Sequence, residues 1–223
     1  MKKLLLALAV MLTLTACTST NTPVETEPVE TTTPEPTEEV VTADLPAPQD
    51  TTKEYKANAE DETTTPCAAG VYGVDCSSIT AENLTDYLGR TDVLYIDLRD
   101  YADYAKAHLR NFEVVPYFAA IMGEENQLYS GTPEEPVARY EESDELLEAF
   151  FPKDTTIFLM CQSGGRVAQL MKLLEVKGYD MSRIYNIGGM AQYGISEYTA
   201  LTTQTSELVV DATYTFEGLT LAE

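Results

Sequence analysis

Apolar runs of strand length alternate with stretches of helix length from residue 80 to residue 187. Strands are predicted at residues 92–98 (DVLYIDL), 113–116 (EVVP), 155–161 (TTIFLMC) and 183–187 (RIYNI). Helices are predicted at residues 80–88, 101–107, 143–151 and 166–178. Because apolar strands that alternate with helices pair in parallel and are covered on both faces, the sequence predicts an α/β fold with a central, mostly parallel sheet flanked by helices.

Two residues with capping preferences mark helix ends. Ser143 stands at the N-cap position of the helix at residues 143–151, where a serine hydroxyl can accept a hydrogen bond from a free backbone N–H. Gly178 closes the helix at residues 166–178, because glycine readily adopts the left-handed conformation that ends a helix.

The N-terminus has the pattern of a bacterial export signal. Two lysines precede an apolar run that is too short to span a bilayer, and small residues follow it. The sequence LTAC at residues 14–17 resembles the lipobox of bacterial lipoproteins, in which the cysteine carries the lipid. We expect residues 1–16 to be a signal peptide and Cys17 to anchor the chain to the extracytoplasmic face of the cell membrane. The alternative is an ordinary cleaved signal peptide.

Residues 17–66 consist almost entirely of Thr, Pro, Glu, Val and Ala. A segment of this composition cannot bury enough apolar surface to fold, and its prolines and glutamates keep it extended. We expect a disordered tether that carries one folded domain at residues 67–200. Residues 201–223 form a C-terminal extension, either an extra strand or a loose tail.

The chain is strongly acidic, with a formal net charge of -23 at pH 7. A chain of this charge repels nucleic acids and anionic lipid headgroups, so neither is expected as a partner. The membrane contact that we expect is therefore the lipid on Cys17.

Three cysteines remain once Cys17 is assigned to the lipid. Cys67 and Cys76 lie close together, and in an extracytoplasmic chain they either form a disulfide or stay as free thiols; the sequence fits both. The chain has one histidine, His108, and no Cys or His pair with zinc spacing, so no metal and no cofactor are expected. Cys161 is left as an isolated thiol.

Cys161 ends a predicted strand just before a predicted helix, at the sheet edge where α/β proteins bind ligands. The four residues after it are Gln162, Ser163, Gly164 and Gly165. They let the backbone curl so that N–H groups point at the sulfur, and the helix N-terminus adds positive charge. Both effects favour an accessible, nucleophilic thiolate, and Arg166 could fix the loop or an anionic substrate. A buried structural cysteine is the alternative, but it leaves the glycines and Arg166 unexplained.

Further motifs accompany this loop in a fixed order. They are Asp97-Leu98-Arg99, Asp103-Tyr104, Ala107-His108-Leu109, Pro116, the loop CQSGGR at residues 161–166, Gly188-Gly189-Met190 and Tyr193. Together they resemble the rhodanese-type sulfurtransferases over residues 78–197. The resemblance implies a rhodanese-like domain in which Cys161 is catalytic and residues 162–166 form the substrate-binding loop.

The chain departs from the family pattern at several positions. Ala107 replaces the usual glycine, Asn111-Phe112 replaces the usual Gly-Ala, and Tyr193 stands where tryptophan is typical. A longer connection at residues 123–143 follows the proline strand. These changes affect the mouth of the site, so they bear on substrate choice more than on fold.

Loop length favours one chemistry over another. Four residues separate Cys161 from Arg166, whereas phosphatases with similar loops have five, and the tighter ring suits one sulfur atom. The resemblance implies that Cys161 takes a sulfane sulfur from a small sulfur-containing anion such as thiosulfate, or from a persulfide, and passes it to a nucleophile. The alternative is a non-catalytic rhodanese-like module that binds an envelope protein.

Two charged residues and the histidine have alternative roles. Asp97 and Arg99 could border the pocket, although an ion pair between Arg99 and Asp103 at a helix start is the simpler interpretation. His108 would be the base of a cysteine protease, but the resemblance implies a structural histidine.

Overall fold

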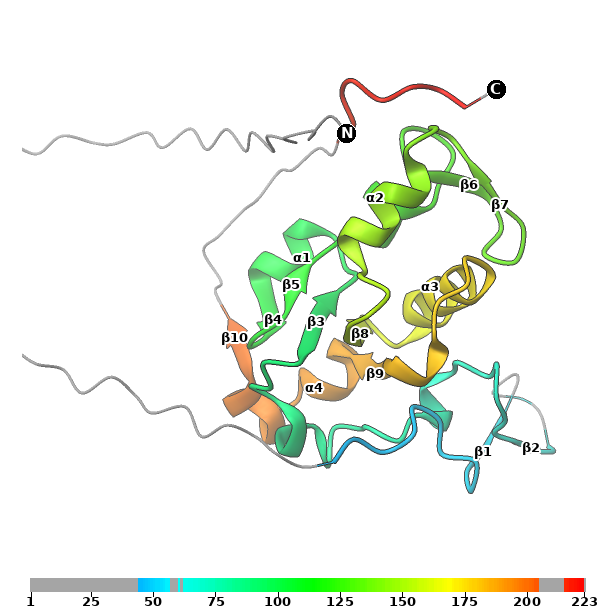
Figure 1. The fold of residues 1–223 in the computed structure, drawn as a ribbon. Helices are drawn as coiled ribbons and strands as arrows, with labels where there is room; N and C mark the ends of the chain where they lie inside the picture. Colours follow the sequence, from blue (N-terminus) through cyan, green and yellow to red (C-terminus); the bar gives the residue numbers. More distant parts are fainter. Residues whose placement is uncertain (1–43, 57–59, 61, 205–214, 223) are drawn as a thin grey trace, which may run out of the picture. The chain divides into compact units, whose positions relative to one another are not determined.

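The computed structural model describes residues 44–56, 60, 62–204 and 215–222 (Figure 1). The predicted signal peptide, Cys17 and the greater part of the predicted tether lie outside these residues. Among the residues described, no helix combines the length and the apolarity needed to cross a membrane.

A four-stranded parallel sheet in the order β5-β3-β8-β9 forms the centre of the fold (Figure 1). Its strands are β3 (Val93–Asp97), β5 (Glu113–Val114), β8 (Thr156–Cys161) and β9 (Ile184–Gly189). The central strand β8 pairs with β3 on one side and β9 on the other. This confirms the predicted α/β fold with a parallel central sheet.

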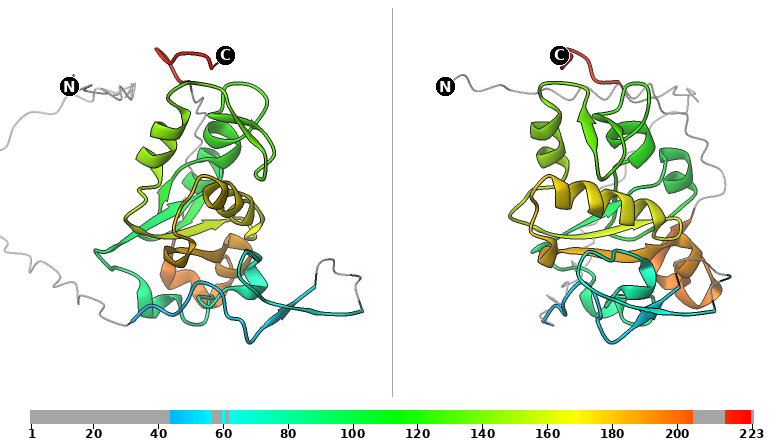
Figure 2. Two further views of the ribbon diagram at one scale, coloured as in Figure 1. Left: turned by 45° about the vertical axis from the view of Figure 1, so that its right-hand side comes forward. Right: turned by 90° about the vertical axis from the view of Figure 1, so that its right-hand side faces the viewer.

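Helices cover both faces of this sheet (Figure 2). The α-helices are α1 (Tyr101–Lys106), α2 (Ser143–Phe150), α3 (Gly165–Val176) and α4 (Met190–Tyr193). Shorter helical turns are η1 (Val74–Cys76), η2 (Leu84–Tyr87), the π-helix η3 (Tyr117–Ile121), η4 (Met181–Arg183) and η5 (Ser196–Leu201). Strand side chains alternate between the faces, so Leu159 and Cys161 belong to the core cluster under α2 and α3, whereas Phe158 and Met160 belong to the cluster on the α4 side.

In the described part of the chain, three two-stranded antiparallel sheets accompany the central sheet. They pair β1 (Glu54–Tyr55) with β2 (Thr65–Pro66), β4 (Ala107–Leu109) with β10 (Thr202–Gln204), and β6 (Tyr129–Gly131) with β7 (Pro136–Ala138). Part of the predicted C-terminal extension thus forms an extra strand. Farther on, Leu221 forms a β-bridge with Tyr140, while residues 205–214 lie outside the described residues.

Two local predictions were wrong, and the one at residues 80–88 was right only in part. The strand at residues 113–116 is not buried, because β5 is a two-residue edge strand. Residues 80–88 form a turn and the short helix η2, because the Asn83 side chain hydrogen-bonds the backbone of Thr80 and Ser78. Ser143 is the first residue of α2 and does not cap it: its hydroxyl donates to Leu128 O and accepts from Tyr140 N, which fixes the preceding loop.

The boundary of the predicted tether at residue 66 also needs correction. Leu45 packs against the core cluster on the α4 side, and the Tyr185 hydroxyl donates to Pro46 O at 2.7 Å. Asp50 N donates to Cys76 O at 2.8 Å. The packed part of the chain therefore includes residues that precede Cys67, because one leucine and several backbone groups are enough to dock a segment whose overall composition is that of a linker.

Candidate functional site

Cys161 is the last residue of β8, and the loop after it turns directly into α3. The Gly164 N–H donates to Cys161 Sγ at 3.2 Å, so the sulfur lies beside the N-terminus of a 12-residue helix. Such a position favours negative charge on the sulfur. The predicted accessibility was wrong: Cys161 is 1% exposed, because its side chain faces the core cluster under α3.

The loop has a covered inner side and an exposed outer side. Gly164 has φ +88°, which disfavours any side chain, and a Cβ there would lie 2.9 Å from the Cβ of Val74. By contrast, Gly165 has no atom within 4 Å of where a Cβ would lie, and Gln162 and Ser163 are exposed. The segment around Val74 therefore covers the inner side of the loop.

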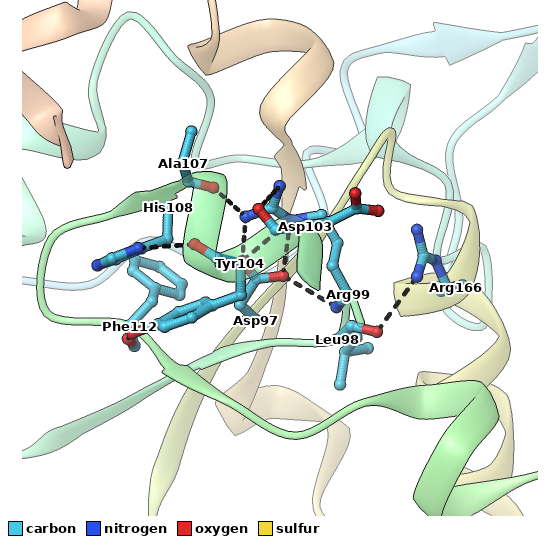
Figure 3. Close-up of polar contacts among 9 residues, drawn as sticks. All are labelled: Asp97, Leu98, Arg99, Asp103, Tyr104, Ala107, His108, Phe112 and Arg166. Atoms are coloured by element: carbon cyan, nitrogen blue, oxygen red, sulfur yellow. Dashed lines mark hydrogen bonds and ion pairs between the residues drawn. The ribbon is translucent and has the colours of Figure 1, made fainter. Parts of the chain in front are cut away.

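Arg166 lies half-buried in the first turn of α3, next to the end of β3 (Figure 3). Its Nη1 donates to Leu98 O at 3.5 Å, and its guanidinium lies 5.7 Å from the ring centroid of Phe118. Within the described part of the chain, Arg166 forms no salt bridge. A guanidinium carries five N–H donors, and only one of them has a protein acceptor among the described residues.

Asp97 and Arg99 form a buried salt bridge at the end of β3 (Figure 3). Arg99 Nη2 lies 2.7 Å from Asp97 Oδ2, and the two side chains are 4% and 0% exposed. Arg99 Nε also donates to the Asp97 carboxylate, at 3.0 Å. Burial raises the pKa of the Asp97 carboxyl, against the opposing attraction of Arg99.

The remaining donors of Arg99 hold the corner between α1 and β4. Nη2 donates to Ala107 O at 2.6 Å, and Nη1 to Asp103 O at 3.4 Å. The predicted ion pair between Arg99 and Asp103 is wrong, because Asp103 contributes its backbone carbonyl while its carboxylate pairs with Lys106 at 3.8 Å. Arg99 is therefore a structural residue beside the site.

His108 lies on β4 and interacts with Tyr104 instead of Cys161. Its Nδ1 donates to Tyr104 O at 2.9 Å, and the two rings stack with centroids 4.0 Å apart (Figure 3). This arrangement fits the structural role that was predicted, and it offers no base for a cysteine protease.

Strand β9 approaches the Cys161 backbone very closely at Gly189. A Cβ on Gly189 would lie 2.3 Å from Cys161 O and 2.6 Å from Gln162 C. The β8–β9 register also shifts between Leu159 and Cys161, an irregularity that re-aims the end of the strand. Glycine is required at residue 189 because the backbone of β9 contacts the backbone of Cys161 and Gln162 and leaves no room for a side chain.

Asn186 is a site residue that the sequence analysis missed. It is 3% exposed in β9, and its side-chain amide bonds Gly164 O, Tyr72 O and Gly188 N. The signal was a lone amide inside the apolar run RIYNI, because a buried polar side chain needs partners.

Cys67 and Cys76 form a disulfide, one of the two alternatives that the sequence left open. Both residues are buried, at 3% and 0% exposed. The disulfide closes the segment that carries Tyr72 and Val74 over the Cys161 loop. The predicted lipid attachment at Cys17 lies outside the described residues.

A surface cavity of about 740 Å³ is lined by Val74, Asp75, Ile187 and Gln192 among others, but not by the Cys161 loop. Within the residues described, no three His, Cys, Asp or Glu side chains are grouped to hold a metal ion.

The chain was compared with protein families, curated proteins and solved structures. The family model of the rhodanese-like domain matches residues 80–195. A search of curated proteins finds no match. Similar solved structures include a rhodanese with anions from E. coli, at 18% identity over 51% of this chain and 99% of that chain, with a TM-score of 0.32.

Two further structures are similar. A rhodanese-like domain protein from Staphylococcus aureus has 22% identity, covers 53% of this chain and 91% of its own, and gives a TM-score of 0.35. A rhodanese-like domain from Anabaena has 17% identity, covers 60% of this chain and 84% of its own, and gives a TM-score of 0.37. Because the family model spans more than half of the 223 residues, the chain belongs to the rhodanese-like domain family.

Proposed function

We propose that the chain is a sulfurtransferase that carries a sulfane sulfur on Cys161. The observation that carries the proposal is the hydrogen bond from Gly164 N–H to Cys161 Sγ, at 3.2 Å, in a loop that opens α3. A backbone donor and a helix N-terminus stabilise negative charge on a thiolate before transfer and on a persulfide after it.

The reaction needs two displacements and no external oxidant. The Cys161 thiolate attacks the outer sulfur of thiosulfate, a new S–S bond forms, and sulfite leaves with the electron pair of the broken S–S bond. Cyanide or a thiolate then attacks the outer sulfur of the Cys161 persulfide. The Cys161 thiolate leaves with the electron pair and is ready for another cycle.

Arg166 supports an anionic donor in this scheme. It forms no salt bridge among the described residues, and its one hydrogen bond to Leu98 O is long, at 3.5 Å. A guanidinium with free donors binds anions through paired, charge-assisted hydrogen bonds. The four residues between Cys161 and Arg166 leave a ring that suits one transferred sulfur.

The burial of Cys161 favours a second candidate, a non-catalytic rhodanese-like module. The residue is 1% exposed, so a donor reaches the sulfur only when the loop or the Tyr72–Val74 region above it shifts. A module that binds an envelope protein would need no such movement.

Mass spectrometry of the purified full chain distinguishes the two functions. Supplied with thiosulfate or a polysulfide, the peptide that carries Cys161 should gain one sulfur atom. Cys161→Ser should release no thiocyanate from thiosulfate and cyanide, while its thermal unfolding stays close to wild type. A folded wild-type chain whose Cys161 gains no sulfur supports the binding module.

The proposed location is the extracytoplasmic face of the cell membrane, with a lipid on Cys17. Support comes from the LTAC motif and the export signal before it. Metabolic labelling with a fatty acid tests this, because label that persists in Cys17→Ser excludes Cys17 as the lipid site.

A further inference from the structure

Asn186, in the middle of β9, connects this strand to two other parts of the chain, the loop at Gly164 and the segment at Tyr72. Its Nδ2 donates to Tyr72 O at 2.7 Å and to Gly164 O at 3.2 Å, and its Oδ1 accepts from Gly188 N at 3.0 Å. Carbonyl oxygens only accept and N–H groups only donate, so these partners fix the orientation of the amide. With 3% of the residue exposed, water cannot replace the three bonds at low cost.

The bond to Gly164 reaches the proposed active site directly. The Gly164 N–H points at Cys161 Sγ, while its carbonyl accepts from Asn186 and from Ala168 N, the latter at 3.0 Å. The Gly164 N–H belongs to the peptide unit before its Cα and the carbonyl to the unit after it, so the two bonds to the carbonyl fix where Gly164 lies and not the N–H itself. Asn186 therefore restrains the residue that presents the donor to Cys161.

We propose that Asn186 is a positioning residue for sulfur transfer, which keeps the Gly164 N–H aimed at Cys161 Sγ. The proposal rests on the sulfurtransferase function proposed above. The same amide group ties the loop to Tyr72 O, close to where Val74 covers Gly164. Asn186 thus sets both the geometry of the loop and the closeness of the segment that covers it.

Ser77 offers a matched control in the same region. Its hydroxyl shares its single proton between two carbonyl oxygens, Asn186 O and Ile79 O, and the residue is 2% exposed. Ser77→Ala removes buried hydrogen bonds from the same strand residue, but no contact with Gly164. It should reproduce the loss of stability in Asn186→Ala without altering the loop.

The experiment compares the full-length wild type, Asn186→Ala and Ser77→Ala in two assays. In the first, iodoacetamide alkylation of Cys161, followed by peptide mass spectrometry, should be at least about fivefold faster in Asn186→Ala, because the freed loop exposes the thiol. In the second, thiosulfate turnover per alkylatable Cys161 should show kcat about tenfold lower or more, with KM within about threefold. Ser77→Ala should stay within about twofold of wild type in both assays.

Equal values for Asn186→Ala and Ser77→Ala in both assays would overturn the proposal. If Asn186→Ala does not fold, Asn186→Asp takes its place, because it keeps the size and the acceptor for Gly188 N but loses both donors. Wild-type behaviour of Asn186→Asp would also overturn the proposal. A wild type that transfers no sulfur refutes the proposed function instead, and the alkylation assay still tests the restraint on the loop.

Discussion

The ends of β3 and β8 lie side by side, and each is followed by an arginine, but the two arginines differ in their commitments (Figure 3). Arg99, after β3, is buried and bonds the Asp97 carboxylate and two backbone carbonyls. Arg166, after β8, is half-buried, with one long bond and the Phe118 ring. The hydrogen bonds of Arg99 hold the end of β3 and the α1–β4 corner together. Arg166 has few protein partners, which is why we propose it as the residue that binds the donor.

The largest effect should follow from Arg99→Ala. Removing one partner of a buried ion pair leaves Asp97 uncompensated, so the free energy of unfolding should fall by about 3 to 5 kcal/mol. Urea unfolding measures this, with Arg166→Ala as the control, which should lose less than about 1 kcal/mol. A similar loss in both variants would remove the distinction between the two arginines.

The folding stability of Arg99→Ala should also depend on pH. Burial raises the pKa of folded Asp97 above its value in the unfolded chain, so acid protonates the folded state first. The stability lost in Arg99→Ala should therefore be partly regained as pH falls and the Asp97 carboxyl becomes neutral. A deficit that stays constant with falling pH would mean that Asp97 is not the group left unpaired.

Arg166→Ala should have the next largest effect, on rate instead of stability. Losing a charge-assisted hydrogen bond to an anionic donor costs about 2 to 3 kcal/mol, or roughly thirty- to more than a hundredfold in thiosulfate turnover. Lysine should rescue only part of the loss, because it keeps the charge without the planar fork of donors. If alanine, lysine and wild type turn over equally, Arg166 has no role in donor binding.

His108→Gln should have the smallest effect, and it tests whether the residues beside β3 are structural. It removes the bond to Tyr104 O and the stacked ring, so stability should fall by about 0.5 to 1.5 kcal/mol. Formation of the Cys161 persulfide should stay within about tenfold of wild type, a barrier change of about 1.4 kcal/mol. A loss of several orders of magnitude in a stable variant would identify His108 as a catalytic base.

The sequence predicted the elements better than the contacts between them. Apolar periodicity located β3, β8, α3 and β9, because burial on both faces leaves a local pattern. The partner of Arg99 was missed, because a helix spacing was applied where the chain is still extended and residues two apart share a face. The burial of Cys161 was also missed, because it faces a core built from distant segments, and the covering segment at Tyr72 and Val74 lies far away in the sequence.

The role of Asn186 could be predicted only in part. Its polarity inside an apolar strand was visible, but its two distant partners were not, because Gly164 O lies in the loop after β8 and Tyr72 O in an N-terminal segment that only the fold brings to β9. The segment at residues 44–56 was assigned to the tether for a related reason. Composition averages over a segment, whereas docking needs only a few well-placed groups.

The large sequence separation between β3 and β8 also affects how fast the Cys161 thiol is buried during folding. Val93 pairs with Thr156 across a long stretch of chain, and such distant parallel pairing forms slowly. Until β3, β8 and β9 have assembled, Cys161 is as exposed as Cys67 and Cys76, and under oxidising conditions any two of the three can be joined. The yield of protein with the Cys67–Cys76 disulfide therefore depends on the rate of sheet assembly relative to the rate of thiol oxidation. Slow oxidation favours the native disulfide.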